Sequence, residues 1–256
     1  MTKPRTSRDN EGTSGMRRIG TATAAALVCV LVVSAGMALG RGTTFKNSGF
    51  ERNSFQFWQT KQEGDSGFFT VYKGSPSILS FFPDLGPRGG EVPTLRKPRR
   101  GKYAASSVQS GPGTRLLLRN IDLKPDTKRK LAFVLSYDNL AGEFSNPEPD
   151  SLHIASDPPR AYGAGGRSER GISGGNQQYR VDIIRKDADP YSIDDADVIK
   201  NLLKSKPGDD PSSGWHRYRF NVSSLPAGQA KLRVAEADEN GNLLVGFDAL
   251  KLAQTK

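Results

Sequence analysis

The sequence of 256 residues contains one cysteine, Cys29, and only two histidines, His153 and His216. A single cysteine forms no internal disulfide, so the chain is not a small scaffold that disulfides hold together. The sequence also lacks the His-Glu-x-x-His and phosphate-loop motifs that mark zinc proteases and nucleotide-binding enzymes. Aromatic residues make up 8% and charged residues 25% of the chain, which is a globular composition. These features favour a non-catalytic globular protein over an enzyme, and a hydrolase is the weakest of the hypotheses.

The first 40 residues are predicted to direct export. Residues 1–18 form a polar, basic leader, and residues 19–40 then carry no charge. As a helix, residues 19–40 would extend about 33 Å, which is enough to span a bilayer. Arg17 and Arg18 favour a leader that stays in the cytoplasm. We expect either a cleaved signal peptide or an uncleaved signal-anchor helix, and in both cases a C-terminal domain outside the cytoplasm, secreted or held at the membrane.

The formal net charge is +10, and its largest local contribution is the basic stretch 88–102. This stretch holds six basic residues against one acidic residue, Glu91. Such a cluster is typical of a surface that contacts an anionic polymer: nucleic acid, acidic polysaccharide or phospholipid headgroups. The same cluster also occurs in solvated loops that bind no partner. We favour the solvated loop, because the sequence contains no nucleic-acid motif. We expect no nucleic-acid partner.

Alternation of apolar and polar residues is the main structural signal after residue 45. Leu131, Phe133, Leu135 and Tyr137, for example, lie on one face of a predicted strand. Such patterns predict strands at 68–73, 78–82, 103–108, 114–119, 130–137, 179–183, 217–222, 231–234 and 243–252. The 28 glycines and 16 prolines mark the turns between them. Many short strands joined by turns predict an all-β fold, an antiparallel β-sandwich or jelly roll.

Two segments depart from this pattern. Residues 194–204 are predicted to form one short helix, with Ser192 as its cap and its apolar side chains at Val198, Ile199, Leu202 and Leu203. Residues 141–176 are rich in Pro, Gly and Ser and are predicted to form a long loop. Loops carry specificity in many binding domains, so we expect it to reside there, with Tyr162 as a candidate aromatic contact.

Two stretches of the sequence resemble one family of domains. The first is Asn47-Ser48-Gly49-Phe50-Glu51 followed by Phe57-Trp58, and the second runs from Gly214-Trp215 to Val245-Gly246-Phe247-Asp248-Ala249-Leu250-Lys251-Leu252. Over residues 45–253 the chain resembles galactose-binding-like jelly-roll domains of exported bacterial proteins, the fold of many carbohydrate-binding modules. The resemblance implies a single domain over residues 45–256 and a core position for Trp58 and Trp215.

The resemblance also implies a structural Ca²⁺ ion between Glu51 and Asp248. In the predicted last strand Asp248 is in phase with Leu244, Leu250 and Leu252, so its carboxylate would point where apolar side chains point. A carboxylate in such surroundings needs a cation or several hydrogen-bond donors. The alternative is that Glu51 and Asp248 accept backbone N–H groups. No ligand-binding residue is assigned.

The remaining candidate residues are given structural roles. The acidic cluster Asp187, Asp189, Asp194, Asp195 and Asp197 lacks the spacing of an EF-hand calcium loop, and several of its members, such as Asp194 and Asp195, suit the N-terminus of the predicted helix, so a second calcium loop is not favoured. His216 is in phase with Tyr218 and Phe220 and is expected to be a hydrogen-bonded strand residue. The sequence therefore predicts an exported, non-catalytic module that binds cell-wall or extracellular carbohydrate. The alternative is a structural envelope protein whose basic stretch 88–102 binds a protein partner.

Overall fold

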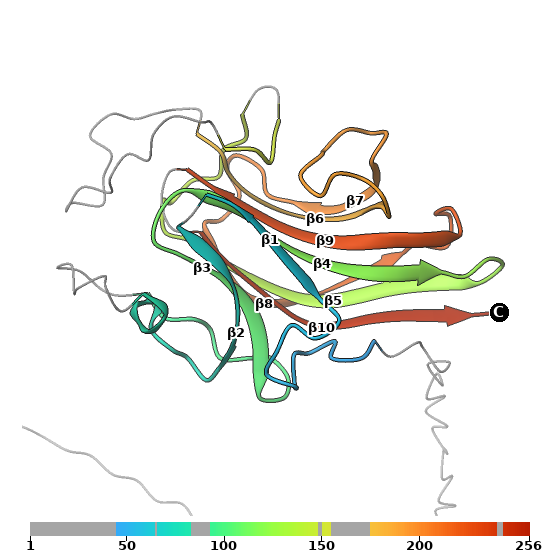
Figure 1. Ribbon diagram of the computed structural model, residues 1–256, viewed down its shortest axis with the longest axis horizontal. Coiled ribbons are helices and arrows are strands. Elements are labelled where there is room, and N and C mark those ends of the chain that lie inside the picture. The colour runs from blue at the N-terminus through green and yellow to red at the C-terminus, as the bar shows by residue number, and fades with distance from the viewer. Residues whose placement is uncertain (1–44, 65, 83–92, 148–149, 155–174, 240–242) are drawn as a thin grey trace, which may run out of the picture. The chain divides into compact units, whose positions relative to one another are not determined.

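The computed structural model describes residues 45–64, 66–82, 93–147, 150–154, 175–239 and 243–256. These residues form two antiparallel β-sheets of five strands each (Figure 1). Most consecutive strands lie in different sheets, so the chain passes repeatedly from one layer to the other. The fold is therefore the all-β antiparallel sandwich that the alternation of the sequence predicted.

The first sheet has the strand order β1-β4-β9-β6-β7. Its strands are β1 (Gln59–Glu63), β4 (Gly113–Leu123), β9 (Gly228–Asp238), β6 (Gln177–Arg185) and β7 (Val198–Lys204). β4 and β9 pair in unbroken register along their whole length, whereas the pairing of β6 with β7 shifts twice. The edge strand β7 is thus the irregular one.

The second sheet has the strand order β2-β3-β10-β5-β8. Its strands are β2 (Gly67–Lys73), β3 (Tyr103–Gln109), β10 (Leu243–Thr255), β5 (Lys128–Asn139) and β8 (Ser212–Asn221). β10 and β5 pair along almost their full length, with one bulge between Asp248 and Lys251. The bulge reverses which face of the sheet the following residues of β10 point to.

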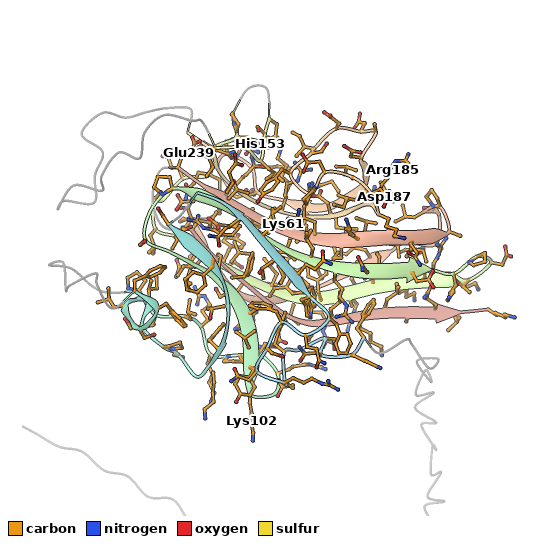
Figure 2. All side chains as sticks on the ribbon, in the orientation of Figure 1. Lys61, Lys102, His153, Arg185, Asp187 and Glu239 are labelled. Atoms are coloured by element: carbon orange, nitrogen blue, oxygen red, sulfur yellow. The ribbon has the colours of Figure 1, made fainter. Side chains whose placement is uncertain are left out.

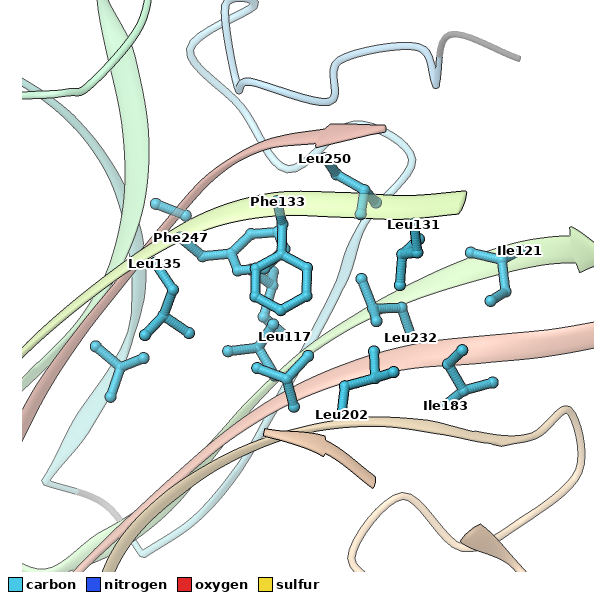
Figure 3. Packing of buried hydrophobic residues seen from close by; sticks show 14 of the residues in the cluster. Leu117, Ile121, Leu131, Phe133, Leu135, Ile183, Leu202, Leu232, Phe247 and Leu250 are labelled. Atoms are coloured by element: carbon cyan, nitrogen blue, oxygen red, sulfur yellow. The ribbon is translucent and has the colours of Figure 1, made fainter. Parts of the chain in front are cut away.

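The main core fills the space between the sheets (Figure 3). Phe133 of β5 and Phe247 of β10 pack with their ring centroids 5.3 Å apart, and they face Leu117 and Leu232 of the first sheet. Burial of each such side chain contributes about 1.5–3 kcal/mol. The alternation of apolar and polar residues in the sequence arises because the apolar residues occupy these inward-facing positions.

A second apolar cluster lies on the outer face of the second sheet. Residues 93–101, here named the crossing segment, run over this face together with the 3₁₀ helix η1 (Ile78–Phe81). Leu95 donates its N–H to the Pro76 carbonyl at 2.9 Å, and Trp215 donates its indole N–H to the Lys97 carbonyl at 2.8 Å. Part of the outer face is therefore covered by the chain itself.

Eight of the nine predicted strands are present, with bounds that differ by a few residues. The strand predicted at 78–82 is wrong, because Ser77 caps a 3₁₀ helix there by accepting the Leu79 N–H through its hydroxyl. β1 was not predicted, because its sequence Gln-Thr-Lys-Gln-Glu contains no apolar residue. It exists as an edge strand through its pairing with β4.

The helix predicted at 194–204 is also wrong, because the structure forms a turn and then β7. Two shifts of register against β6 break the alternation in β7, so that Ile199, Leu202 and Leu203 all pack in or against the main core. Bulges of this kind add a residue to one strand and break the period of two. The resulting spacing imitates the period of a helix. Ser192 accepts the Asp194 N–H at 3.2 Å as part of the turn, so its capping role starts no helix.

The leader 1–18 and the export segment 19–40 lie outside the described residues, as does most of the predicted loop 141–176, including Tyr162. Within the described part of the chain, no helix is long and apolar enough to cross a membrane. The export segment therefore stays a prediction.

Candidate functional site

Glu51 reaches a turn that belongs to a distant part of the chain. Its carboxylate accepts the Lys102 N–H at 3.0 and 3.1 Å and the Tyr103 N–H at 3.3 Å. Gly101, in the left-handed conformation with φ +64°, makes this close approach possible. A Cβ atom on Gly101 would lie 2.1 Å from the Glu51 Oε1 atom. Glu51 therefore links the segment before β1 to the start of β3.

Asp248 is fully buried and reaches the same turn from the other side. Its carboxylate accepts the Arg100 N–H at 3.2 Å and its neighbour's Ala249 N–H at 2.6 Å. Burial, and to a lesser degree the charge of Glu51, raises the pKa of Asp248 to about 7, although both backbone N–H groups oppose this. Residues 100–103 thus hold the two predicted site carboxylates near each other.

The strand phase assigned to Asp248 is partly wrong. Phe247 points into the core, so Asp248 lies on the outer face with Leu244, as predicted. Leu250 belongs to the core, because the bulge after Asp248 reverses the phase and Ala249 adopts φ +55°. The carboxylate therefore points away from the main core and under the crossing segment.

The donor set shows how far these residues suit a calcium ion. Ca²⁺ takes six to eight oxygen ligands. Glu51 and Asp248 supply carboxylates, but both accept backbone N–H groups, which is the alternative that the sequence left open. Within the described ranges no group of three or more His, Cys, Asp and Glu residues is placed to hold a metal ion. Any further ligands would have to be backbone carbonyls or water.

An open cleft of about 680 Å³ lies where the loop after β6 faces the turn before β9. Figure 2 shows Arg185 and Asp187 at this end of the sandwich. We name it the loop cleft. Its lining includes Arg185, Asp187, Asp195, Asp197, Ile199 and Gln229. Its volume is within the range of about 300–1,000 Å³ that small-molecule sites occupy.

A buried ion-pair network anchors the loop that forms the cleft. Arg233 of β9 binds Asp182 of β6 at 2.7 Å, and both side chains are fully buried. Arg233 also donates to the carbonyls of Pro190 and Ser192, at 2.8 and 2.6 Å. Burial lowers the pKa of Arg233, while Asp182 acts in the opposite direction. The loop 187–193 is therefore fixed to the rigid sheet at its middle.

The acidic cluster 187–197 belongs to this loop and not to a helix. Asp189 accepts the Tyr191 N–H at 3.1 Å, and Asp187, Asp195 and Asp197 line the loop cleft. The sequence signal for the cleft was this run of acidic residues together with Pro226-Ala227-Gly228. Neither stretch reveals by itself that the two face each other.

The two tryptophans have different positions. Trp58 is buried and stacks on Phe50 with ring centroids 5.1 Å apart, which confirms its core role. Trp215 lies on the outer face of the second sheet, half-buried against Gly246, where a Cβ atom would come within 2.8 Å of its ring. Trp215 is therefore not in the main core. A hollow on the same outer face, lined by Tyr72, Leu244 and Gly246 among others, has room for about one water molecule, so it admits no sugar ring.

The histidines show no catalytic arrangement in the described part of the chain. His153 lies 3.2 Å from Glu63 and stacks on Tyr191 (Figure 2). His216 is a strand residue, as predicted, and lies in β8 opposite Leu135. The predicted hydrogen bond of its side chain is not formed with any described residue. Residues 171–175 match the letters Gly-x-Ser-x-Gly, but β6 follows them, whereas a nucleophile elbow leads into a helix.

A second buried polar cluster lies between the sheets, near the ends of β4 and β9. Arg115 and Glu236 are both fully buried, with 3.4 Å between Nη1 and Oε1. Burial raises the pKa of Glu236 well above its ordinary value, and Arg115 opposes this rise. Arg115 also binds the Gly111 and Gly113 carbonyls, each at 2.9 Å. The cluster closes the end of the core.

Comparison with known proteins identifies no family. No family profile and no curated protein matches the sequence. Among solved structures, TmCBM61 in complex with β-1,4-galactotriose is 11% identical, with a TM-score of 0.46, over 84% of this chain and 100% of that chain. The K1 cleaved adhesin domain of Lys-gingipain from Porphyromonas gingivalis is 13% identical, with a TM-score of 0.40, over 80% and 94%.

The Stig cyclase Fisc from Fischerella is 14% identical, with a TM-score of 0.39, over 83% of this chain and 96% of that chain. At such identities and TM-scores, these likenesses assign neither a ligand nor an activity. The two antiparallel sheets themselves agree with the β-sandwich or jelly roll that the sequence predicted.

Proposed function

We propose that this protein is a non-catalytic binding module that holds a carbohydrate of the cell wall or extracellular space in the loop cleft. The observation that carries the proposal is the cleft itself, an open site of about 680 Å³ on a fold without a catalytic arrangement in its described part. Its loop is fixed to the first sheet by Arg233, so the site is preorganised.

The lining of the cleft suits sugar hydroxyl groups. Carboxylates of Asp187 and Asp195 accept hydrogen bonds, and the Arg185 guanidinium and the Gln229 amide donate them. Ile199 adds apolar surface against which the C–H groups of a sugar ring would pack. Acceptors, donors and a small apolar surface in one open cleft are what recognition of a neutral saccharide requires.

The test is a glycan array with the full chain, followed by titration calorimetry on the glycans that bind. Replacement of both Asp187 and Asp195 by Asn keeps the size of the side chains but removes two charged acceptors. We expect this variant to bind at least about tenfold more weakly, because each charged hydrogen bond contributes about 1.5–3 kcal/mol. Asp210→Asn, an exposed change outside the cleft, is the control.

Absence of glycan binding, or equal binding by the cleft variant, would contradict the proposal. Recovery of a protein partner by the wild type, in the absence of any glycan ligand, would support instead the structural envelope protein that the sequence left as the alternative.

The calcium ion at Glu51 and Asp248 is a second proposal for this domain. It is supported by the two carboxylates that meet the turn 100–103 and by the raised pKa of Asp248, because a cation would stabilise the charged form. Against it stand the backbone N–H groups that both carboxylates already accept. In the test, the melting temperature is measured with Ca²⁺ and with chelator. A calcium site requires that Ca²⁺ raise the melting temperature of the wild type and that Asp248→Asn abolish this increase.

Export is the third proposal, and it rests on the sequence of residues 1–40. Amino-terminal sequencing of the protein outside the cytoplasm tests it. A start near Leu39 indicates a cleaved signal peptide, and an intact leader in the membrane fraction indicates an anchor. Protein found only in the cytoplasm would contradict both.

A further inference from the structure

The outer face of the second sheet beyond the crossing segment carries a row of cations. Residues that pair directly across strands point to the same face of a sheet. Arg217 of β8 pairs with Val134 of β5, which pairs with Asp248 of β10. Because Asp248 faces outward, Arg217 does so as well. Arg219, two residues further on, points the same way.

The next rows add two lysines to this surface. Arg219 pairs with Ala132, which pairs with Lys251, so these three side chains share the outer face. Lys130 lies two residues before Ala132 in β5 and therefore also faces outward. These four cationic residues, Lys130, Arg217, Arg219 and Lys251, are exposed, and only the small Ala132 separates Arg219 from Lys251.

The crossing segment brings two further arginines to the same place. The Arg100 N–H binds Asp248, which shares a row with Arg217, and the Lys97 carbonyl accepts the indole N–H of Trp215 in β8. Both Arg99 and Arg100 are exposed. The resulting surface is named the cationic face. It consists of Arg99, Arg100, Lys130, Arg217, Arg219 and Lys251.

Among the described residues, the cationic face holds more positive charges than there are carboxylates beside it. None of its six side chains forms an ion pair with a described residue. The pKa of Arg217 is lowered chiefly by the charge of Arg100, and further by partial burial and by the charges of Arg219 and Arg99. Two carboxylates lie close to the face, at the turn 100–103, and both accept backbone N–H groups: Asp248 is buried, and Glu51 is exposed. An unbalanced cluster of this kind attracts an anionic partner.

We propose that the cationic face binds an acidic polysaccharide, a glycan that carries a carboxylate or similar oxyanion along its chain. Four of the six cations are arginines, whose planar guanidinium groups bind such groups through two parallel hydrogen bonds. Side chains two residues apart on a strand are about 7 Å apart, so an extended polymer can contact several of them at once. This surface is separate from the loop cleft and is independent of its function.

Two other anionic partners fit the face less well. Sequence-tolerant binding of single-stranded nucleic acid needs free aromatic rings on which bases stack. Trp215, the aromatic residue beside the face, is half-buried and bonded to Lys97. Stable membrane attachment needs apolar insertion beside the charge. The exposed large apolar side chains of the described residues are Phe57, Phe68 and Leu140. Phe68 is in β2, at the opposite edge of the second sheet from Arg217 and Arg219 in β8, and Phe57 and Leu140 lie outside the strands of this sheet.

The test measures binding of the full chain to two polysaccharides: polygalacturonate, an acidic polymer of galacturonic acid, and β-1,4-galactan, a neutral polymer of galactose. The variant Arg217→Gln/Arg219→Gln removes two exposed cations from the face. The control Lys61→Gln/Lys200→Gln removes two exposed cations from the first sheet, so the net charge changes equally. Binding is measured by biolayer interferometry at about 50 and 200 mM salt, with double-stranded DNA and anionic vesicles as further probes.

The proposal expects wild-type binding to polygalacturonate that weakens with salt, a loss of about tenfold or more in the arginine variant, and a change below about twofold in the control. No binding to polygalacturonate, or equal loss in both variants, would overturn it. Tighter binding to DNA or to vesicles than to polygalacturonate would overturn the choice of partner. The Asp187 and Asp195 variant of the loop cleft should bind polygalacturonate as the wild type does, so the two proposals can fail separately.

Discussion

The raised pKa of Asp248 predicts an unusual dependence of stability on pH. A carboxylate whose pKa is higher in the folded than in the unfolded protein binds a proton more tightly in the folded state. Between pH 4 and 7 the folded protein therefore binds more protons, and its stability falls as pH rises. This is opposite in sign to the effect of an ion-paired aspartate, whose stabilisation appears as pH rises.

The magnitude follows from the ordinary value of 3.8 and the folded value of about 7. At 1.36 kcal/mol for each pKa unit, full ionisation of Asp248 costs the folded state about 4 kcal/mol relative to the unfolded chain. The loss begins near pH 4 and is complete a little above pH 7. That is a large share of the 5–15 kcal/mol typical of a domain.

The assay is urea unfolding of the wild type and of Asp248→Asn at intervals from pH 4 to 8, in the presence of chelator. The Asn side chain keeps one acceptor and loses the other, so its own cost is constant with pH. Glu236, whose pKa is also raised, contributes equally to both proteins because it lies in the other sheet. The difference in free energy of unfolding should therefore change by about 4 kcal/mol in favour of the variant as pH rises.

Parallel pH curves for the two proteins would refute the reasoning, because they would mean that the protonation of Asp248 is the same folded and unfolded. Addition of Ca²⁺ gives a second measurement. If the ion binds beside Asp248, the wild type should lose much of its pH dependence, because the charged carboxylate is then stabilised, and Asp248→Asn should not respond.

Three further predictions concern close packing and buried charge. Gly101→Ala should lower the free energy of unfolding by more than Gly74→Ala does. Both glycines have positive φ, but of the two only Gly101 is placed where a Cβ atom would meet another group, the Glu51 carboxylate. The difference between the two variants in urea unfolding therefore measures the cost of that contact. Arg115→Met should lower the free energy of unfolding by about 3–5 kcal/mol, because it leaves the Glu236 carboxylate buried without its cation. Adding Glu236→Gln to this variant should restore part of the lost stability. Unchanged stability in Arg115→Met alone would contradict the pairing. Trp215→Phe should raise hydrogen exchange in the crossing segment, since it removes that segment's indole hydrogen bond, whereas protection equal to that of the wild type would show that the bond does not hold it.

The strands of the core were predictable because their signal is local. Leu131, Phe133 and Leu135 alternate with residues that point outward, and burial of one face enforces that period wherever the pairing is regular. Where the pairing is irregular or the strand lies at an edge, the local signal fails. β7 contains register shifts that imitate a helical period, and β1 has no buried residue to mark it.

For the candidate sites too, the sequence revealed local patterns but not contacts between distant residues. Glu51 and Asp248 were selected from the sequence by resemblance, but only the turn 100–103 brings them together, across about 200 residues of chain. The acidic run 187–197 was visible, whereas the loop cleft exists because Arg233 fixes that run opposite the turn before β9. Such contacts join residues that are distant in sequence, and no local pattern encodes them.

The sequence by itself determined the class of the fold, the predicted export segment and the surplus of positive charge, because composition and alternation are properties of neighbouring residues. Only the tertiary structure decided that Asp248 lies beneath the crossing segment, and that Arg99 and Arg100 join Arg217 and Arg219 on one surface. The physical reason is that strand register determines which side chains share a face. Register is set by the pairing of whole strands and not by the residues of any one of them.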